Sequence, residues 1–118
     1  MRIENAIIKS VDLSMADHGC LTLSMTLEGA GWGCRFGNRV LGFGFLGADT
    51  FSGTPKGIEY IMRIMDTVGV ERFNDLKGKY IRVASDSWGG KIEAIGNILE
   101  DKWFNEEDFF NEEEGKKE

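Results

Sequence analysis

The sequence WGCRFGNR, at positions 32–39, combines two arginines with aromatic rings and glycines. Arg35 and Arg39 can each offer a planar fork of N–H donors to a phosphate or a carboxylate. Trp32 and Phe36 can stack on a flat ring, and the glycines permit close approach of the backbone. We therefore expect a nucleotide-type ligand at Trp32, Arg35, Phe36, Asn38 and Arg39. The alternative is structural: the two aromatic residues belong to the core and the arginines pair with surface acids.

A second glycine pattern follows, because GFGFLG at positions 42–47 matches G-x-G-x-x-G. In a dinucleotide-binding fold, the third glycine opens a helix whose N-terminus faces the pyrophosphate. Here the expected helix begins several residues later and contains Asp66, the acid that lies at about the required distance of twenty residues. No G-K-[ST] occurs either. The sequence therefore predicts neither a Rossmann site nor a P-loop.

His18, Cys20 and Cys34 are the other residues whose types could do chemistry, as metal ligands or as a nucleophile and its base. Their spacing matches neither C-x-x-C nor H-x-x-x-H. We interpret His18 as a turn residue and the cysteines as small, reduced core residues. The sequence thus predicts no catalytic residue, no metal and no cofactor, and a protein that is not an enzyme.

Antiparallel strands are expected to position the arginine segment. Apolar residues alternate with polar ones from position 7 to position 27, with a turn at residues 16–19, and this pattern predicts a hairpin. Ile7, Val11, Leu13 and Met15 form the expected apolar side of its first strand. A third strand begins at Trp32. The glycine-rich stretch between positions 29 and 57 is the least predictable part of the fold.

A helix is expected to start at Thr54 and Pro55, as N-cap and first helical residue, and to stop at Gly69. Its predicted apolar stripe is Ile58, Ile61, Met62, Met65 and Val68, with Glu59 and Arg63 paired on the outer face. A short helical turn is expected next, over residues 71–76. A second hairpin follows, with strands over residues 80–84 and 91–98 that are joined by residues 85–90. The order β-β-β-α-β-β predicts an α+β fold, an antiparallel sheet with one main helix on a face.

The C-terminal stretch carries much of the net charge of −6. We predict one domain over residues 1–104 and an acidic, partly disordered tail over residues 105–118, in which Glu106, Glu107 and residues 112–114 are solvated. Trp103 and Phe104 are expected to dock on the body. Too few basic residues are available for direct nucleic-acid binding, and no apolar run is long enough for a membrane span. A sharper alternative is that the tail imitates a nucleic-acid strand and occupies a basic groove of a partner.

Five phrases spread over nearly the whole chain, IENAIIKS, DHG, LEGAGWG, VGVERFNDLKGKYIRV and IGNILEDKWF, resemble a widespread group of small bacteriophage and prophage accessory proteins. The phrases are structural rather than catalytic. The resemblance implies a viral protein in the cytoplasm of the host bacterium that acts by binding and antagonises antiviral defence.

Three functions follow from this resemblance. The first is sequestration of a nucleotide immune signal by a homo-oligomer. The second is inhibition of a host defence protein, a nuclease, by an acidic surface that imitates nucleic acid. The third is an accessory role without a ligand. The arginine segment suits the first function and the acidic tail suits the second.

Overall fold

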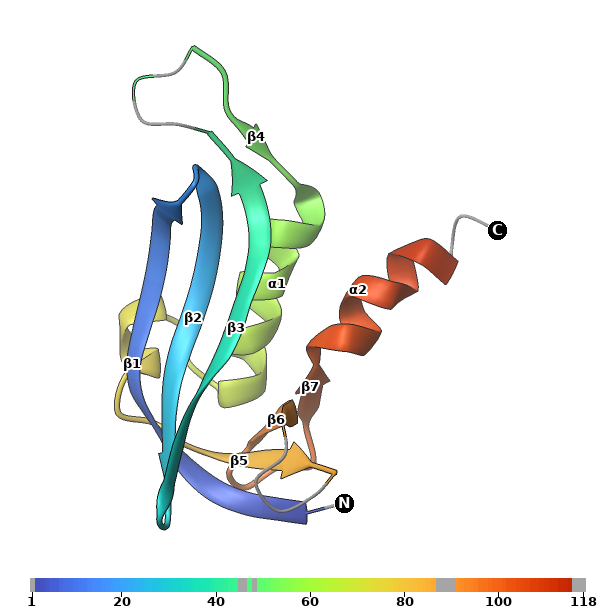
Figure 1. Ribbon diagram of the computed structural model, residues 1–118. Coiled ribbons are helices and arrows are strands. Elements are labelled where there is room, and N and C mark those ends of the chain that lie inside the picture. Colours follow the sequence, from blue (N-terminus) through green and yellow to red (C-terminus); the bar gives the residue numbers. More distant parts are fainter. Residues whose placement is uncertain (1, 45–46, 48, 87–90, 116–118) are drawn as a thin grey trace.

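Seven strands form one curled antiparallel sheet around a single main helix, as the computed structural model shows (Figure 1). It describes residues 2–44, 47, 49–86 and 91–115, and side chains up to residue 111 apart from that of residue 17. The strands are β1 (Arg2–Asp17), β2 (Cys20–Gly29), β3 (Trp32–Phe43), β4 (Ser52–Gly53), β5 (Tyr80–Ser85), β6 (Ile92–Asn97) and β7 (Trp103–Asn105). The helices are α1 (Pro55–Val68), the short 3-10 helix η1 (Phe73–Leu76) and α2 (Glu106–Gly115). The predicted α+β fold with an antiparallel sheet is confirmed, and β4, β7 and α2 add to the predicted order.

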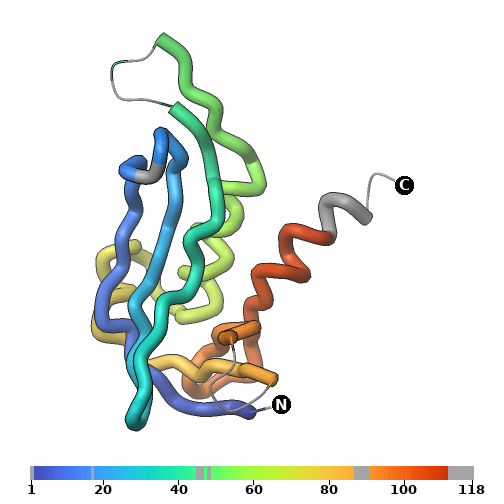
Figure 2. The backbone as a smooth tube through the Cα atoms, in the orientation of Figure 1, coloured from blue at the N-terminus to red at the C-terminus, as the bar shows by residue number. Residues whose placement is uncertain are grey.

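The sheet order is β4-β3-β2-β1-β5-β6-β7, so the first strand lies in the middle. β1 pairs with β5 through residues 2–7 and with β2 through residues 7–17. The tube in Figure 2 shows how the long β1–β2–β3 meander and the shorter β5–β6–β7 strands meet along β1. The sheet therefore curls, and its inner face, the one packed on α1, encloses the core.

A bulge in β1 changes which residues face that core. Ile8 pairs with Leu27, but the next pair is Ser10 with Thr26, so Lys9 is an extra residue. Because side chains alternate along a strand, one extra residue reverses the alternation. Ile8 is fully buried, whereas Ile7 is only partly buried. The predicted apolar side was therefore wrong at Ile7.

The ends of α1 are as predicted. Thr54 has extended backbone angles, and its hydroxyl accepts a hydrogen bond from the Gly57 amide at 2.8 Å. Pro55 occupies the first turn, where its missing N–H costs nothing. At the other end, Gly69 adopts a φ of 91°, and its amide donates to the Met65 carbonyl.

The buried face of α1 differs from the predicted stripe. The exposed fractions of Ile58 and Met62 are 59% and 62%. The buried helix residues are Gly57, Tyr60, Ile64 and Thr67. The reason is the close approach of α1 to β3: a Cβ at position 57 would collide with the Leu41 carbonyl, so only glycine lets the helix turn this face inward. Ile61, Met65 and Val68 remain at the margin of the core.

Helix α2 occupies the start of the stretch predicted as an acidic, partly disordered tail. Phe109 and Glu106 are each only 5% exposed. The interpretation of Glu106 as a solvated residue without apolar neighbours was wrong, because the side chain lies against Tyr60 of α1. Phe104 is buried as predicted. The side chains of residues 112–114 lie outside the described part of the chain, and the domain boundary stays a prediction.

Two predicted segments lie partly outside the described residues. The turn that joins the strands of the second hairpin includes residues 87–90, and the G-x-G-x-x-G segment includes residues 45 and 46. The pairing of β5 with β6 is nevertheless described and confirms the hairpin. α1 begins at Pro55, well after Gly47, as the argument against a Rossmann site expected.

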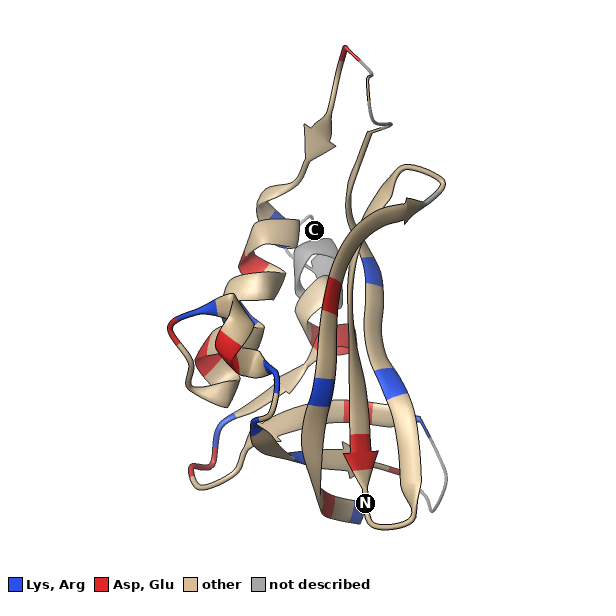
Figure 3. Ribbon diagram, turned by 90° about the vertical axis from the view of Figure 1, so that its left-hand side faces the viewer, with Lys and Arg blue, Asp and Glu red and all other residues tan. Residues whose placement is uncertain are grey.

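Charged residues of both signs are distributed along the strands and α1, as Figure 3 shows from the side. The predicted pair on the outer face of α1 is confirmed: Arg63 Nη2 lies 2.8 Å from Glu59 Oε2. Within the part of the chain that the structure describes, no helix is long and apolar enough to cross a membrane.

Candidate functional site

A bulge in β3 interrupts the segment predicted to bind a ligand. Gly37 pairs with Ser24 of β2, but the next pair joins Arg39 to Leu23, so Asn38 is the extra residue. Gly37 and Asn38 both have positive φ angles, 104° and 68°. Glycine and asparagine tolerate this region better than other residues do. The two residue types thus explain where the bulge forms.

The bulge sends the two arginines of the predicted site to opposite faces of the sheet. Arg35 pairs with Thr26 on the outer face and is exposed, whereas Arg39 pairs with the fully buried Leu23 on the inner face. On a regular strand, residues four apart would share a face. The chain therefore does not bring these arginines together around one ligand.

The other predicted site residues also separate. Phe36 is a core residue with 3% exposure, as the structural alternative proposed, and Asn38 is exposed at the bulge. Trp32 is half-buried near the β2–β3 turn, where its indole covers Gly29 so closely that a Cβ could not fit. No described residue accepts a hydrogen bond from its buried Nε1.

Arg39 is held by residues of α2. Its Nη2 donates to Glu107 Oε1 at 3.0 Å, and its Nε lies 3.6 Å from Glu106 Oε1. The guanidinium carbon stands 5.1 Å from the centroid of the Phe110 ring. Lys91 adds a contact of 3.6 Å to Glu107. We call these five residues the Arg39 cluster.

A buried hydrogen bond links this cluster to α1. The Tyr60 hydroxyl donates to Glu106 Oε2 at 2.8 Å. Burial, and then the charge and hydrogen bond of Glu106, raise the pKa of Tyr60 far above its ordinary value, while Arg39 acts in the opposite direction. Tyr60 therefore stays protonated as a donor. The Tyr60 ring also meets Phe104 at 5.5 Å and Phe110 at 5.4 Å between centroids, so α1, β7 and α2 converge here.

A small hollow lies between β3 and the start of β6 and α2, and we call it the seam hollow. Its volume is about 130 Å³, and residues 34–37, Lys91, Ile92 and Glu106 line it. Burial raises the pKa of the Cys34 thiol, which makes this side chain a poorer nucleophile at neutral pH. Ligand pockets usually have volumes of roughly 300–1,000 Å³. The seam hollow is too small for a nucleotide as it stands.

A larger hollow of about 330 Å³ lies between α1 and the segment that runs from β7 into α2. We call it the α1–β7 groove. Its lining residues are Arg63, Trp103, Phe104, Asn105, Asp108 and Phe109. The two phenylalanines are buried, and Trp103 is fixed by Arg82, whose guanidinium carbon stands 4.8 Å from the indole centroid. The groove thus combines aromatic walls with a guanidinium and a carboxylate.

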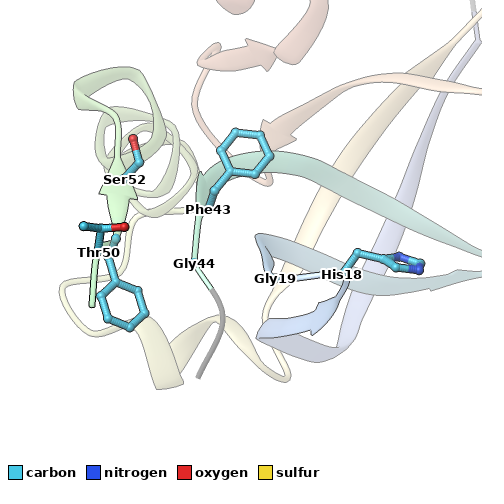
Figure 4. A pocket seen from close by; sticks show the side chains of 7 residues that line it. His18, Gly19, Phe43, Gly44, Thr50 and Ser52 are labelled. Atoms are coloured by element: carbon cyan, nitrogen blue, oxygen red, sulfur yellow. The ribbon is translucent and has the colours of Figure 1, made fainter. Parts of the chain in front are cut away.

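Another hollow, of about 270 Å³, lies at the far end of the sheet between the β1–β2 turn and the β3–β4 connection. Figure 4 shows Thr50 and Ser52 on one side, Gly19 and His18 on the other, and Phe43 and Gly44 between them. Phe43 and Phe51 are more than half exposed, and Phe51 lies against Gly44. The lining residues of this hollow include no arginine, lysine, aspartate or glutamate.

The described residues contain no cluster of three or more His, Cys, Asp or Glu side chains that could hold a metal ion. Cys20 pairs with Phe43 and Cys34 with Leu27, so the two free cysteines lie at opposite ends of β2 and β3.

Sequence reasoning missed the α1–β7 groove because its residues come from distant elements. The pairing of Arg63 with Glu59 and the docking of Phe104 were each predicted, but nothing in the sequence places the two segments side by side. Comparison of the chain with protein-family models, with curated proteins and with solved structures found no match.

Proposed function

We propose that the protein is a non-enzymatic, phage-type binding protein that antagonises bacterial antiviral defence by sequestering a nucleotide signal in the α1–β7 groove. The proposal rests on one observation: aromatic side chains, a guanidinium and a carboxylate line the same hollow of about 330 Å³. A nucleotide presents a flat ring, a phosphate and sugar hydroxyls, which these three groups complement in turn. The volume falls at the lower end of the range for small-molecule sites.

Five of the six lining residues have a role in this proposal. The rings of Phe104 and Phe109 contact the base, and Asn105 offers its side-chain NH2 to the polar edge of the base, because its Oδ1 already accepts from the Asp108 backbone amide at 3.1 Å. Arg63 binds the phosphate through its fork of N–H donors. The Asp108 carboxylate accepts hydrogen bonds from sugar hydroxyls.

Arg63 suits this role better than Arg39 does. The side chains of Arg63 and Glu59 are 55% and 43% exposed, and an exposed ion pair contributes about 1 kcal/mol or less. A phosphate can therefore replace Glu59 at little cost. Arg39 instead faces the Glu106 side chain, which is only 6% exposed. Removing Arg39 from that partner would leave a buried carboxylate with less compensation.

The proposal is tested by thermal unfolding and calorimetry with a cyclic dinucleotide, a cyclic trinucleotide and cyclic ADP-ribose. A ligand at about 100 times its Kd stabilises the folded state by about 2.7 kcal/mol, which gives a clear rise in Tm. We expect Arg63→Gln to weaken binding by roughly tenfold, since it removes a charge-assisted bond. Arg35→Gln, on the outer face, is the matched control and should bind normally. No Tm shift with any compound would refute the proposal.

We further propose that the protein works as a homo-oligomer in the host cytoplasm. Light scattering of the purified protein measures the oligomeric state, and a monomer at micromolar concentration would contradict this part of the proposal.

A second candidate function is inhibition of a defence nuclease by an acidic surface. The observation that favours it is the gathering of carboxylates around Glu93 of β6. A hydrogen bond to Asp86, burial, and the charges of Asp86 and Asp108 raise the pKa of Glu93, although Lys91 acts in the opposite direction. Closely spaced carboxylates can occupy a basic groove that normally holds phosphates. The double substitution Glu93→Gln and Asp86→Asn removes these charges and keeps α2, so it should weaken inhibition, and full inhibition by that variant would exclude this function.

A further inference from the structure

The α1–β7 groove depends on a helix that is held from its other side. Helix α2 supplies Asp108 and Phe109 to the groove. The preceding residues, Glu106 and Glu107, are the ones that contact Arg39 of β3. Arg39 itself is not among the lining residues of the groove. One short helix thus connects the inner face of β3 with the groove.

The contacts on the two sides of α2 differ in kind. On the groove side, α2 contributes Phe109, which packs against Phe104 with centroids 5.4 Å apart. On the other side, the Arg39 guanidinium bridges two carboxylates and stacks on the Phe110 ring. An arginine can make these contacts together because its guanidinium is planar and carries five donors. The rings of Phe109 and Phe110 also anchor α2 through their contacts with Tyr60, and Arg39 adds the cation for the acids of the first turn.

We infer that Arg39 is a positioning residue of the α1–β7 groove: acting through α2, it holds Asp108 and Phe109 where a ligand can meet them. Without Arg39, Glu106 retains Tyr60 as a buried partner but loses this cation, and among the described residues Glu107 keeps the ion pair with the exposed Lys91. A buried carboxylate without its cation moves toward water. The start of α2 is then expected to loosen against the body, while the core of the sheet stays intact.

The inference is tested first without any ligand, by amide hydrogen exchange of the full chain. Arg39→Gln should speed exchange at residues 108–115, whose amides can donate to the Asn105 cap or within α2, by about tenfold, the effect of losing one charge-assisted contact to a buried partner. Amides in the central part of β1 and β2 should keep their protection. Arg35→Gln is the matched control, because it removes the same side chain from the same strand on the opposite face.

A milder second variant keeps the test valid if Arg39→Gln fails to fold. Glu107→Gln removes the shortest ion pair of the Arg39 cluster at a side chain that is 55% exposed, so the variant should fold normally. We expect a smaller acceleration at residues 108–115, of roughly twofold. Unchanged exchange in this segment in both Arg39→Gln and Glu107→Gln would overturn the inference. So would an equal acceleration of the β1 and β2 core in Arg39→Gln, because Arg39 would then support the whole fold.

The effect on ligand affinity rests on the proposed function. If cyclic ADP-ribose or a cyclic oligonucleotide binds, Arg39→Gln should weaken it by about tenfold although Arg39 does not line the groove. Normal affinity in that variant would refute the positioning role. If none of these compounds binds, the proposed function fails, and the exchange experiment still decides whether Arg39 holds α2.

Discussion

The pKa of Glu93 reflects the charged side chains that surround it. Glu93 extends from β6 toward Asp86 at the end of β5, toward Lys91 and toward Asp108 of α2. Two carboxyl groups that share a hydrogen bond favour the form in which one of them keeps a proton. The pKa of Glu93 is accordingly raised, chiefly by the hydrogen bond to Asp86.

The raised pKa predicts a dependence of stability on pH. The folded chain holds this proton to a higher pH than the unfolded chain, whose Glu ionises near pH 4.3, at about its ordinary pKa. Stability attributable to Glu93 is therefore present at acid pH and lost as pH rises through the folded pKa. Glu93→Gln keeps a hydrogen-bond donor for Asp86 and cannot ionise. We expect a higher Tm than wild type at pH 7 and no difference at pH 4, and a gap of equal size at both values would contradict the shared proton.

At the scale of an element, the directions of the side chains on strand β3 depend on its bulge. One extra residue decides which of two arginines faces the core and which faces the solvent. Gly37 is the more demanding of the two bulge residues, because a Cβ there would lie 2.6 Å from the Leu23 carbonyl oxygen and its φ is 104°. Asn38 has a φ of 68°, which glycine also adopts without strain.

These geometries predict that substitutions at the two bulge residues differ in their effect on the free energy of unfolding. Gly37→Ala should lower the free energy of unfolding by about 1–3 kcal/mol, through backbone strain and the collision with Leu23. Asn38→Gly serves as the control and should change it by about 1 kcal/mol or less. Urea unfolding of both variants measures the difference. A Gly37→Ala protein as stable as wild type would mean that the bulge has a different form.

At the scale of the whole molecule, the C-terminal helix completes the body rather than merely following it. Phe109 is buried against Phe104 and Tyr60, and Glu106 accepts the Tyr60 hydrogen bond. Burial of one phenylalanine side chain contributes about 1.5–3 kcal/mol. The acidic end of the chain thus has a structural role as well as its charge.

Deletion of residues 105–118 should therefore lower the free energy of unfolding by at least about 2 kcal/mol, because it exposes Phe104 and leaves the Tyr60 hydroxyl without its acceptor. Urea unfolding of the shortened chain tests this. Unchanged stability would instead support an independent domain over residues 1–104 followed by a dispensable tail.

Local patterns predicted the elements of this protein well. Thr54, Pro55 and Gly69 delimit α1 because capping is a property of a few adjacent residues. The face of α1 was harder to predict, because a helix with apolar residues on several sides turns toward whatever surface it meets. Gly57 permits close contact with β3, and Tyr60 donates a hydrogen bond to Glu106. The helix therefore buries Gly57 and Tyr60 in place of Ile58 and Met62.

The sequence by itself determined the α+β class, the antiparallel hairpins and the presence of the arginines and aromatic rings, because alternation, caps and turn residues act over a few positions. Only the tertiary structure decided which of these residues meet. A bulge at Asn38 separated Arg35 from Arg39, and the packing of α2 on α1 brought Arg63 and Asp108 to one groove. Such contacts join residues far apart in the chain, and they depend on register and packing that short-range patterns do not encode.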